Sequence, residues 1–390
     1  MDQPAPDFPR PEPDPRPDPR PDTDMPADPD TARTPDTART LETAPPADMS
    51  GAPGDVAELD ERMTRPDEAV VKSLASCEGD FAVLGAGGKM GYHVARMIAR
   101  GLERLGRDDA VTAVSRFTDS ASTTPFREAG IPTLAADLSD RRQVDALPDF
   151  GNVVYLAGVK FGTGSDPASL RRMNVDMPRL IARRYRDARI VALSTGCVYS
   201  FVDPESGGSK EDDATDPPGD YARSCLGREQ AFVEGSRRHG TRCTLVRLNY
   251  AIDLRYGVLV DVAQKVLAGQ PVDVETGYVN VIWQGDAVAQ ILRCFDLVAA
   301  PPAIINITGV ETLKVREVAQ AFGRRWGVPV TIRGREAATA WLSNSGRARA
   351  LFGPPRVSTQ TMIDWISRWL RRGGETLGKP THFEVRSGRY

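Results

Sequence analysis

Histidine and cysteine are scarce in this chain. Its 390 residues include three histidines and five cysteines, and neither type recurs at the short spacings that zinc sites use. The sequence therefore predicts neither a metal centre nor a disulfide framework, and unpaired thiols fit a reducing compartment. The cysteines are Cys77, Cys197, Cys225, Cys243 and Cys294.

Long apolar runs and an excess of one charge are also missing. No segment approaches the ~20 apolar residues that a membrane-spanning helix needs, and no basic N-terminus precedes an apolar core as in a secretory signal. The net charge is −3 with both signs interspersed, which disfavours a nucleic-acid surface. We therefore expect a cytoplasmic protein with a small-molecule substrate and with neither nucleic acid nor membrane as a partner.

Aromatic residues are nearly absent from residues 1–66, where Phe8 is the only one, whereas 16 of the chain's 31 prolines fall there. Pro alternates with Asp and Arg, and PDTART repeats at 29–34 and 35–40. This composition offers too little apolar area to offset the entropy of ordering and predicts a disordered tail over residues 1–66. Two alternatives stay open: a partner-binding segment with polyproline character, or a reading frame that begins at Met49 or Met63.

From residue 79 onward, short β-branched runs alternate with amphipathic stretches. This alternation predicts an α/β fold with a Rossmann-type, doubly wound parallel sheet over residues 79–250 and mainly a smaller substrate-binding lobe over 251–390. Six strands are expected at 81–84, 111–114, 133–135, 153–156, 190–193 and 244–248, with helices at 89–105, 168–186 and 221–238. A further strand is expected inside the lobe at 304–307.

Three glycines at intervals of three residues follow the first predicted strand directly. Gly85 permits a tight turn, Gly88 lets the backbone approach a pyrophosphate, and Gly91 lets the next helix pack closely on the strand. The start of that helix offers unpaired N–H groups and a partial positive charge to phosphates. The turn, which includes Lys89 and Met90, therefore predicts binding of NAD(H) or NADP(H).

The end of the second predicted strand bears on the choice between these two cofactors. An acidic residue there would favour the free 2′-hydroxyl of NAD, but the strand ends in Ser115 and Arg116. A guanidinium can bind a 2′-phosphate through two hydrogen bonds. The sequence therefore favours NADP over NAD.

Further motifs, in order along roughly residues 79 to 370, resemble the extended short-chain dehydrogenase/reductases, the NAD-dependent epimerase/dehydratase family. Asp137-Leu138 looks like the pair that meets the adenine ring, VVYLAGVKFG at 153–162 resembles the fourth-strand segment, and Asn174-Val175 matches the next helix. The resemblance implies that the cofactor site includes Asp137, Leu138, Leu156, Ala157, Gly158 and Lys160.

The same resemblance implies a catalytic set. LSTGCVYS at 193–200 is similar to the family's Ser-Ser-x-x-x-Val-Tyr strand end and places Thr195 at the catalytic hydroxyl, with Tyr199 on the substrate side. Tyr221 takes the position of the acid/base in Tyr-x-x-x-Lys, in which Lys holds the nicotinamide ribose and lowers the pKa of Tyr. Here the Lys position is Cys225, which the resemblance also places at the cofactor.

A thiol cannot supply the permanent positive charge of a lysine, so three explanations compete. Lys160, or less readily Arg228, supplies the charge instead. Alternatively, the enzyme uses Cys225 or another group, for example as the acid in an elimination or epimerisation. The third explanation is a protein that binds the cofactor without redox turnover.

The substrate segment departs from the family as well. Nucleotide-sugar epimerases commonly carry Arg-Asp before the DVA-type helix, and alignment on Asp286 puts Val279 and Asn280 there. A nucleotide-sugar diphosphate is therefore less certain than a smaller polyol, sugar or sugar acid. The residues expected to meet the substrate are Thr195, Tyr199, Asn249, Arg255, Tyr256, Asn280 and Trp283.

Two functions follow from these residues. The leading hypothesis is an NAD(P)-dependent oxidoreductase or epimerase/dehydratase that acts on a hydroxylated carbohydrate-like substrate, with Thr195 and Tyr221 as catalytic residues and Lys160 assisting the cofactor. The rival is a non-catalytic NAD(P)-binding regulatory or interaction protein of the same fold. The resemblance also implies a homodimer formed through the helices that carry Asn174 and Tyr221.

Overall fold

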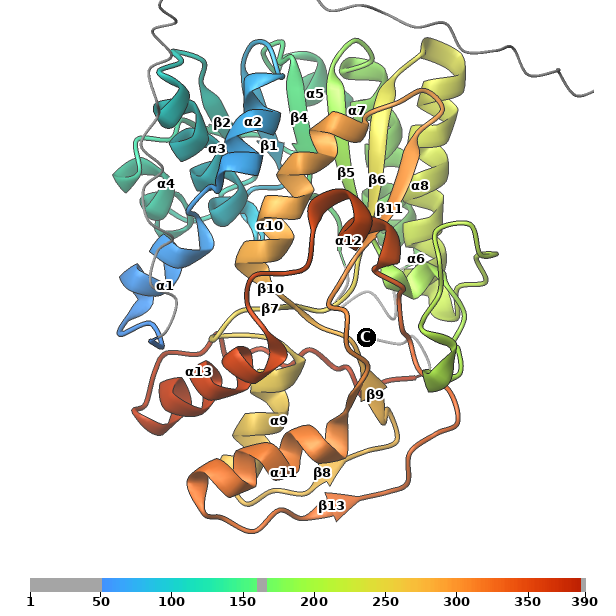
Figure 1. Ribbon diagram of the computed structural model, residues 1–390. Coiled ribbons are helices and arrows are strands. Elements are labelled where there is room, and N and C mark those ends of the chain that lie inside the picture. The colour runs from blue at the N-terminus through green and yellow to red at the C-terminus, as the bar shows by residue number, and fades with distance from the viewer. Residues whose placement is uncertain (1–50, 160–166, 387–390) are drawn as a thin grey trace, which may run out of the picture. The chain divides into compact units, whose positions relative to one another are not determined.

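The computed structural model describes residues 51–159 and 167–386. Seven parallel strands form its central sheet in the order β11-β6-β5-β4-β1-β2-β3 (Figure 1). This confirms the predicted Rossmann-type doubly wound fold. The strands are β1 (Phe81–Leu84), β2 (Val111–Ser115), β3 (Thr133–Ala135), β4 (Asn152–Tyr155), β5 (Arg189–Thr195), β6 (Arg242–Leu248) and β11 (Ala303–Ile307).

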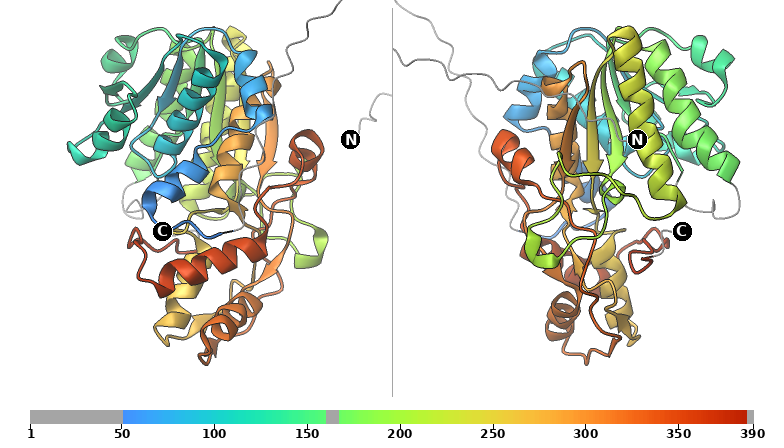
Figure 2. Two further views of the ribbon diagram at one scale, coloured as in Figure 1. Left: turned by 60° about the vertical axis from the view of Figure 1, so that its left-hand side comes forward. Right: turned by 90° about the vertical axis from the view of Figure 1, so that its right-hand side faces the viewer.

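Both faces of the sheet are covered, because its strands carry apolar residues on alternate sides. In β1, Phe81 and Val83 point into one core while Ala82 and Leu84 point into the other. The first face packs against α2 (Glu68–Ala75), α3 (Gly91–Leu105) and α10 (Gln284–Arg293), and the second against α5 (Arg141–Asp145), α7 (Met177–Arg184) and α8 (Gly219–His239), as Figure 2 shows.

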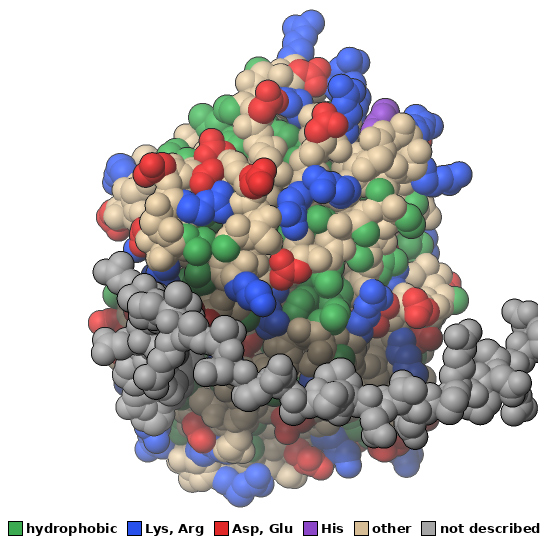
Figure 3. Space-filling view, turned by 45° about the horizontal axis from the view of Figure 1, so that its top comes forward, with side chains coloured by type: hydrophobic (Ala, Val, Ile, Leu, Met, Phe, Trp, Pro, Cys, Tyr) green, Lys and Arg blue, Asp and Glu red, His purple; other side chains and the backbone are tan. Residues whose placement is uncertain are grey.

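Short elements join these layers. A turn of π-helix, Arg172–Asp176, connects α6 to α7 and is labelled η2 here. The remaining helices around the sheet are α4 (Thr124–Glu128), α6 (Pro167–Arg171) and α12 (Gly346–Phe352), with 3-10 turns η1 (Ala121–Thr123), η3 (Gly196–Val198), η4 (Pro204–Ser206) and η5 (Cys294–Leu297). The face seen in Figure 3 carries basic and acidic side chains interspersed.

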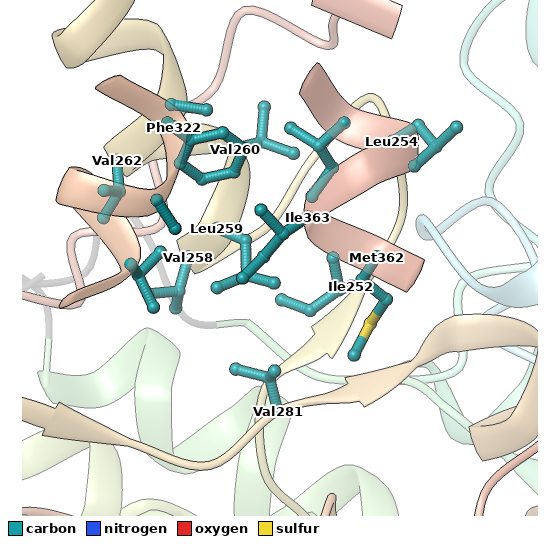
Figure 4. Close-up of a cluster of buried hydrophobic side chains, with 14 of the residues drawn as sticks. Ile252, Leu254, Val258, Leu259, Val260, Val262, Val281, Phe322, Met362 and Ile363 are labelled. Atoms are coloured by element: carbon teal, nitrogen blue, oxygen red, sulfur yellow. The ribbon is translucent and has the colours of Figure 1, made fainter. Parts of the chain in front are cut away.

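The smaller lobe lies beyond the carboxyl ends of the strands (Figure 1). Its core gathers branched side chains such as Val258, Leu259 and Ile363 around Phe322 (Figure 4). Three helices supply most of it: α9 (Val258–Leu267), α11 (Val315–Trp326) and α13 (Thr359–Arg371). Two-residue strands complete it: β7 (Ala251–Ile252), β8 (Val272–Asp273), β9 (Tyr278–Val279), β10 (Ile282–Trp283), β12 (Leu313–Lys314) and β13 (Ile332–Arg333).

The C-terminal part of the chain contributes more to the sheet than predicted. Strand β11, expected in the lobe, pairs in parallel with β6 from Ala303↔Thr244 to Ile307↔Leu248. Helix α10 packs on α2 and α3. Strand β11 and helix α10 therefore follow residue 250 in the chain but belong to the sheet, because β11 pairs with the edge of β6 and buries Ile305 and Ile307 in the core on the first face.

Residues 51–66 correct the predicted tail. Helix α1 (Val56–Met63) begins at Asp55, whose side chain accepts a hydrogen bond from the backbone N–H of Glu58. Leu59 and Met63 are completely buried in the core of the smaller lobe. The prediction of a disordered tail is therefore wrong for residues 51–66, because two large apolar side chains one helical turn apart suffice to dock this helix. Residues 1–50 lie outside the described residues.

Candidate cofactor and active site

The glycine turn between β1 and α3 has the geometry that its spacing predicts. Gly85 has φ +88°, and a Cβ there would lie 2.6 Å from Cα of Ala157. A Cβ on Gly91 would lie 2.0 Å from the backbone oxygen of Ala86. A Cβ on Gly88 would meet only the Gly85 oxygen, at 3.4 Å. Gly85 and Gly91 therefore let neighbouring backbone segments pack closely, and Gly88 leaves open space beside the backbone.

Gly87 is a further constraint that the three-glycine spacing does not reveal. A Cβ on Gly87 would lie 2.8 Å from Oγ of Ser115, at the end of β2. The turn and the β2 end are thus held in close contact. Ser115 is one of the two residues predicted to select the cofactor, and this contact fixes its distance from the phosphate turn.

A cleft of about 250 Å³ opens where β1 and β4 end. Adjacent strands β1 and β4 carry their crossovers to opposite sides, which is the switch point where doubly wound sheets bind ligands. Nine of the predicted cofactor residues line this cleft. They are Gly85, Gly88, Ser115, Arg116, Asp137, Leu138, Leu156, Ala157 and Gly158, joined by Gly87, Ala136, Val159, Met173 and Met177.

The remaining cofactor predictions fall elsewhere or outside the description. The Lys89 ammonium lies 3.0 Å from the centroid of the Tyr256 ring, and Met90 packs against the core beneath α3. Neither lines the cleft. Lys160 lies outside the described residues, so its predicted role stays a prediction.

The end of the cleft beside β2 and β3 carries both signs of charge. Oδ1 of Asp137 accepts hydrogen bonds from the backbone N–H of Ser139 (2.9 Å) and from its hydroxyl (2.8 Å). These bonds, with a smaller contribution from Arg116, lower the pKa of Asp137 below its usual value. The ionised carboxylate and the guanidinium therefore face one ligand site.

The cleft fits a dinucleotide. The turn brings the N-terminus of α3 to the cleft, and the open side of Gly88 lets phosphate oxygens approach backbone N–H groups. Leu156 and Met173 contribute apolar surface to the lining, and Arg116 and Asp137 contribute charge. The lining can therefore both stack against a ring of the ligand and form charged hydrogen bonds with it.

The predicted acid/base lies at the start of α8. Tyr221 is half-buried, and the surrounding protein raises its pKa well above the usual value, mainly through desolvation. Its side chain shares a hydrogen bond with that of Cys225, which is fully buried and whose own pKa is raised by burial. The thiol of Cys225 and the phenol of Tyr221 therefore both stay protonated around neutral pH.

Thr195 ends β5 and is half-buried. Its Oγ1 accepts a hydrogen bond from the backbone N–H of Cys197 (3.2 Å) and so begins the turn η3. The same turn brings Cys197 close enough to Tyr221 to influence its ionisation. Thr195 thus begins the short turn whose Cys197 lies near Tyr221.

Asn174 ties the helix of Tyr221 to the cleft. Its side chain accepts from the N–H of Val159 (3.1 Å) and donates to the oxygen of Val159 (3.0 Å) and to Oγ of Ser224 (2.8 Å). Val159 lines the cleft and Ser224 belongs to α8. A single buried amide therefore fixes the active-site helix against the end of β4.

Arg228 lies on the same face of α8. Its Nη2 donates to Oδ1 of Asn174 (2.8 Å) and its Nη1 to the backbone oxygen of Leu193 (3.0 Å). A Cβ on Gly158 would lie 2.1 Å from Nη2. The guanidinium is therefore packed directly against the lining of the cleft.

Tyr199 does not join the substrate side. It is 1% exposed, and its hydroxyl donates to Oδ1 of Asn306 (2.9 Å) and accepts from Nη1 of Arg247 (2.7 Å). Arg247 in turn forms a buried ion pair with Glu229 (2.8 Å). The hydroxyl is fully used within this network, which removes Tyr199 from the substrate contacts.

Trp283 and Arg255 are also turned to other partners. Trp283 is buried in the lobe core, with its ring edge-on to that of Trp365 at 5.4 Å. Arg255 pairs with Asp253 (2.8 Å) and with Asp60 of α1 (2.9 Å). The partners that bury Trp283 and pair with Arg255 include residues from distant parts of the sequence, so a local motif cannot predict these contacts.

Asn249 and Asn280 are brought together. Nδ2 of Asn249 donates to Oδ1 of Asn280 (2.6 Å), and Nδ2 of Asn280 donates to the backbone oxygen of Ser343 (2.6 Å). Both side chains are buried. They join β6, the β9–β10 connection and the segment before α12, a positioning role beside Gly196, where a Cβ would lie 2.6 Å from Oγ of Ser343.

Some residues near Tyr221 escape sequence reasoning because they come from distant segments. Trp341 stacks on Phe201 at 4.4 Å, and the Arg386 guanidinium covers the Phe201 ring at 4.2 Å. Trp341 also packs against Cys197. Tyr250, with φ +41° and a pKa raised by burial, lies near Cys197 and Glu384. The segment that carries Glu384 and Arg386 thus reaches Tyr250 and Phe201.

Among the described residues, no helix is both long and apolar enough to cross a membrane, and no cluster of His, Cys, Asp and Glu could hold a metal ion. Each of the five cysteines is a buried free thiol.

Solved structures with the same fold are numerous. A dTDP-glucose 4,6-dehydratase double mutant from Streptomyces venezuelae, with NAD bound, is 19% identical with a TM-score of 0.65, covering 75% of this chain and 97% of its own. A Thermus thermophilus UDP-glucose 4-epimerase complex with NAD is 21% identical (TM-score 0.60; 75% and 99%). A Bacillus cereus UDP-glucuronic acid 4-epimerase with NAD is 16% identical (TM-score 0.61; 74% and 99%).

Curated protein sequences give no match to this chain. The family model for the NAD dependent epimerase/dehydratase family matches residues 81–277, which span the glycine turn, the cleft, Thr195 and Tyr221. This chain therefore belongs to the NAD-dependent epimerase/dehydratase family.

Proposed function

We propose that the chain is an NAD(P)-dependent oxidoreductase or epimerase/dehydratase acting on a hydroxylated carbohydrate-like substrate. The observation that carries this proposal is the connection from the cleft through Asn174 to the turn of α8 that holds Tyr221. It fixes a proton-transferring hydroxyl relative to a dinucleotide cleft.

In this proposal the cofactor residues and the catalytic residues have separate roles. Gly85, Gly88 and the start of α3 hold the pyrophosphate, and the residues at the ends of β2 and β3 hold the adenosine. A nicotinamide dinucleotide, when bound, supplies hydride exchange. Tyr221 gives or takes the proton of the substrate hydroxyl, and Thr195 hydrogen-bonds the same oxygen. The raised pKa keeps Tyr221 protonated around neutral pH, so it can donate a proton directly, whereas action as a base requires a nearby positive charge.

Two features bear on the class of substrate. Two similar structures are described as complexes with UDP-glucose and with UDP-glucuronic acid, which favours a sugar. Val279 stands where an arginine would meet a diphosphate, and the nearby Trp341–Phe201 pair offers an aromatic surface. We therefore favour a polyol, sugar or sugar acid over a nucleotide sugar.

For the cofactor, the family favours NAD, whereas Ser115 and Arg116 at the cleft favour the 2′-phosphate of NADP. Fluorescence titration with NADH and NADPH tests this choice. Tighter NADPH binding that is lost in Arg116→Ala supports NADP, and tighter NADH binding rejects it.

The alternative is a non-catalytic NAD(P)-binding regulatory or interaction protein, favoured by Cys225 at the lysine position. The absorbance of the reduced cofactor, followed with a panel of sugars and polyols, separates the two. Substrate-dependent loss of that absorbance supports the enzyme, and bound cofactor that no compound bleaches supports the alternative. A homodimer in the cytoplasm stays a prediction, and light scattering that gives a monomer mass would reject the dimer.

A further inference from the structure

A buried cation shares a helical face with the candidate acid/base. Tyr221, Cys225 and Arg228 stand at positions i, i+4 and i+7 of α8. Because a helical side chain leans toward the N-terminus of its helix, the guanidinium reaches back toward the turn of Tyr221. Its charge lies close enough to affect the ionisation of Tyr221 and Cys225.

The contacts of Arg228 hold this charge in one place. Asn174 and the backbone oxygen of Leu193 each accept one hydrogen bond, at 2.8 and 3.0 Å. Gly158, which lines the cleft, has no side chain to displace the guanidinium. The position therefore lies between the cofactor cleft and the phenol, on the face of α8 that carries Cys225.

Within residues 51–159 and 167–386, the charge of Arg228 has no acidic partner. The adjacent Glu229 is paired with Arg247 at 2.8 Å and also accepts from Ser194 (2.6 Å). Nε of Arg228 and the hydroxyl of buried Tyr155 both lack a hydrogen-bond partner there. A buried charge without a counter-ion is costly, and an anion that forms beside it would offset that cost.

The groups around the guanidinium of Arg228 limit which of them can become the anion. Arg228 faces Tyr221, Cys225, Tyr155 and the already paired Glu229. Tyr221 faces Cys225 and Arg228 on its own helix and Cys197 from η3. Of these, Tyr221 alone is half-buried rather than buried, so it is the one that can exchange a proton with a substrate.

We propose that Arg228 is a positioning residue that supplies, beside Tyr221, the positive charge for which position 225 offers no lysine. This inference rests on the proposed acid/base function of Tyr221. When Tyr221 acts as a base, its O–H bond breaks, the proton leaves to solvent, and the phenolate then takes the substrate's hydroxyl proton. Arg228 stabilises the phenolate and keeps its own proton throughout.

Arg228 could instead act only as a structural link between α8, β5 and the π-helical turn. The two roles differ in what a neutral replacement does. Gln at position 228 keeps an amide donor for Asn174 but loses the charge, whereas Lys keeps the charge and loses the two-armed geometry. If Arg228 is only a structural link, both substitutions should change the ionisation of Tyr221. If its charge is what matters, only the substitution by Gln should change it.

The test is a ¹⁹F NMR titration of the full chain carrying 2,3-difluorotyrosine at position 221, whose phenol ionises nearer neutral pH than that of tyrosine. The series comprises Arg228→Gln, Arg228→Lys, Arg228→Gln combined with Cys225→Lys, and Lys160→Met. Arg223→Gln is the matched control, because Arg223 is exposed on the same helix and bonds Asp220 (2.6 Å). Arg228→Met is the second neutral variant if Arg228→Gln does not fold.

We expect Arg228→Gln to raise the titration midpoint by about one pH unit or more, and Cys225→Lys to reverse that rise. Arg228→Lys and Arg223→Gln should leave the midpoint near that of the unchanged chain. Equal shifts in Arg228→Gln and Arg228→Lys, no shift in Arg228→Gln, or a shift only in Lys160→Met would overturn the proposal. The titration needs no turnover, so other failures would show separately. Bound cofactor that no compound bleaches would reject the proposed enzyme, and substrate conversion that survives Tyr221→Phe would reject Tyr221 as its acid/base.

Discussion

Nε2 of His93 lies 3.0 Å from Oδ1 of Asp60, across 33 residues of sequence. His93 belongs to the first turn of α3 and is buried, and its Nδ1 lies 3.0 Å from Nε2 of Gln284 on α10. The carboxylate of Asp60 also pairs with Arg255. Helix α1 is thus bonded to the helix that starts at the cofactor turn and to the smaller lobe.

Leu59→Ala should destabilise the chain although Leu59 precedes the family-matched region. Its side chain is completely buried in the lobe core, so truncation should lower the free energy of unfolding by about 2–5 kcal/mol. Urea unfolding followed by tryptophan fluorescence measures this. Leu267→Ala is the control, because Leu267 is 44% exposed and should change stability little. Equal effects of the two variants would show that α1 is not docked.

The Asp60 carboxylate predicts a pH dependence of stability. Burial raises the pKa of Asp60, but hydrogen bonds and charges from His93 and Arg255 outweigh burial and lower it below the usual value. A lowered folded-state pKa stabilises the fold above the unfolded value, about 4, and the gain is lost as the pH falls through the folded value. Asp60→Asn should therefore be less stable than the unchanged chain at neutral pH, with the gap closing below about pH 4. A gap that is constant with pH would contradict this.

Much of the fold could be predicted because its signals are local. The six predicted strands and the glycine turn need only alternation of apolar residues and spacing of glycines. Residues 304–307 are also predicted as a strand, although the pairing of that strand with β6 is not. Helix α1 was missed because proline-rich composition dominated residues 1–66, while its docking depends on Leu59 and Met63 meeting a core formed by residues far along the chain.

The candidate site divides in the same way. Cleft residues such as Gly85 and Asp137 follow the ends of parallel strands, so motif order alone placed them together. Tyr199 and Trp283 were misplaced because a motif gives a position but not the partners that bury it, here Arg247 and Trp365. Glu384 and Arg386 carried no sequence signal, since only the fold brings the C-terminal segment beside Tyr250 and Phe201.

Tyr221→Phe should lower turnover, whereas Tyr199→Phe should lower stability. Tyr221→Phe should keep the fold and cofactor binding and lower turnover about 10²–10⁴-fold, since proton transfer is lost. Tyr199→Phe should instead lower stability by about 1–3 kcal/mol, because the buried Arg247 and Asn306 lose a partner. Turnover with the identified substrate and urea unfolding measure the two effects. Large loss of turnover without loss of stability in Tyr199→Phe would restore it to the site.

Gly88→Ala should separate folding from cofactor binding. A Cβ there meets only the Gly85 oxygen at 3.4 Å, so the chain should fold, but the methyl group should block the approach of phosphate and weaken dinucleotide binding at least tenfold. Gly51→Ala is the control, because its Cβ would meet nothing within 4 Å. Unchanged affinity in Gly88→Ala, measured by calorimetry, would place the phosphates elsewhere.

Equilibrium binding of NADH and NADPH to the full chain tests the dinucleotide cleft most directly. Tryptophan fluorescence quenching and energy transfer to the reduced nicotinamide should saturate at one dinucleotide per chain, with an affinity that Gly88→Ala weakens and Gly51→Ala does not. A properly folded chain that binds neither dinucleotide would contradict both the proposed enzyme and its non-catalytic alternative.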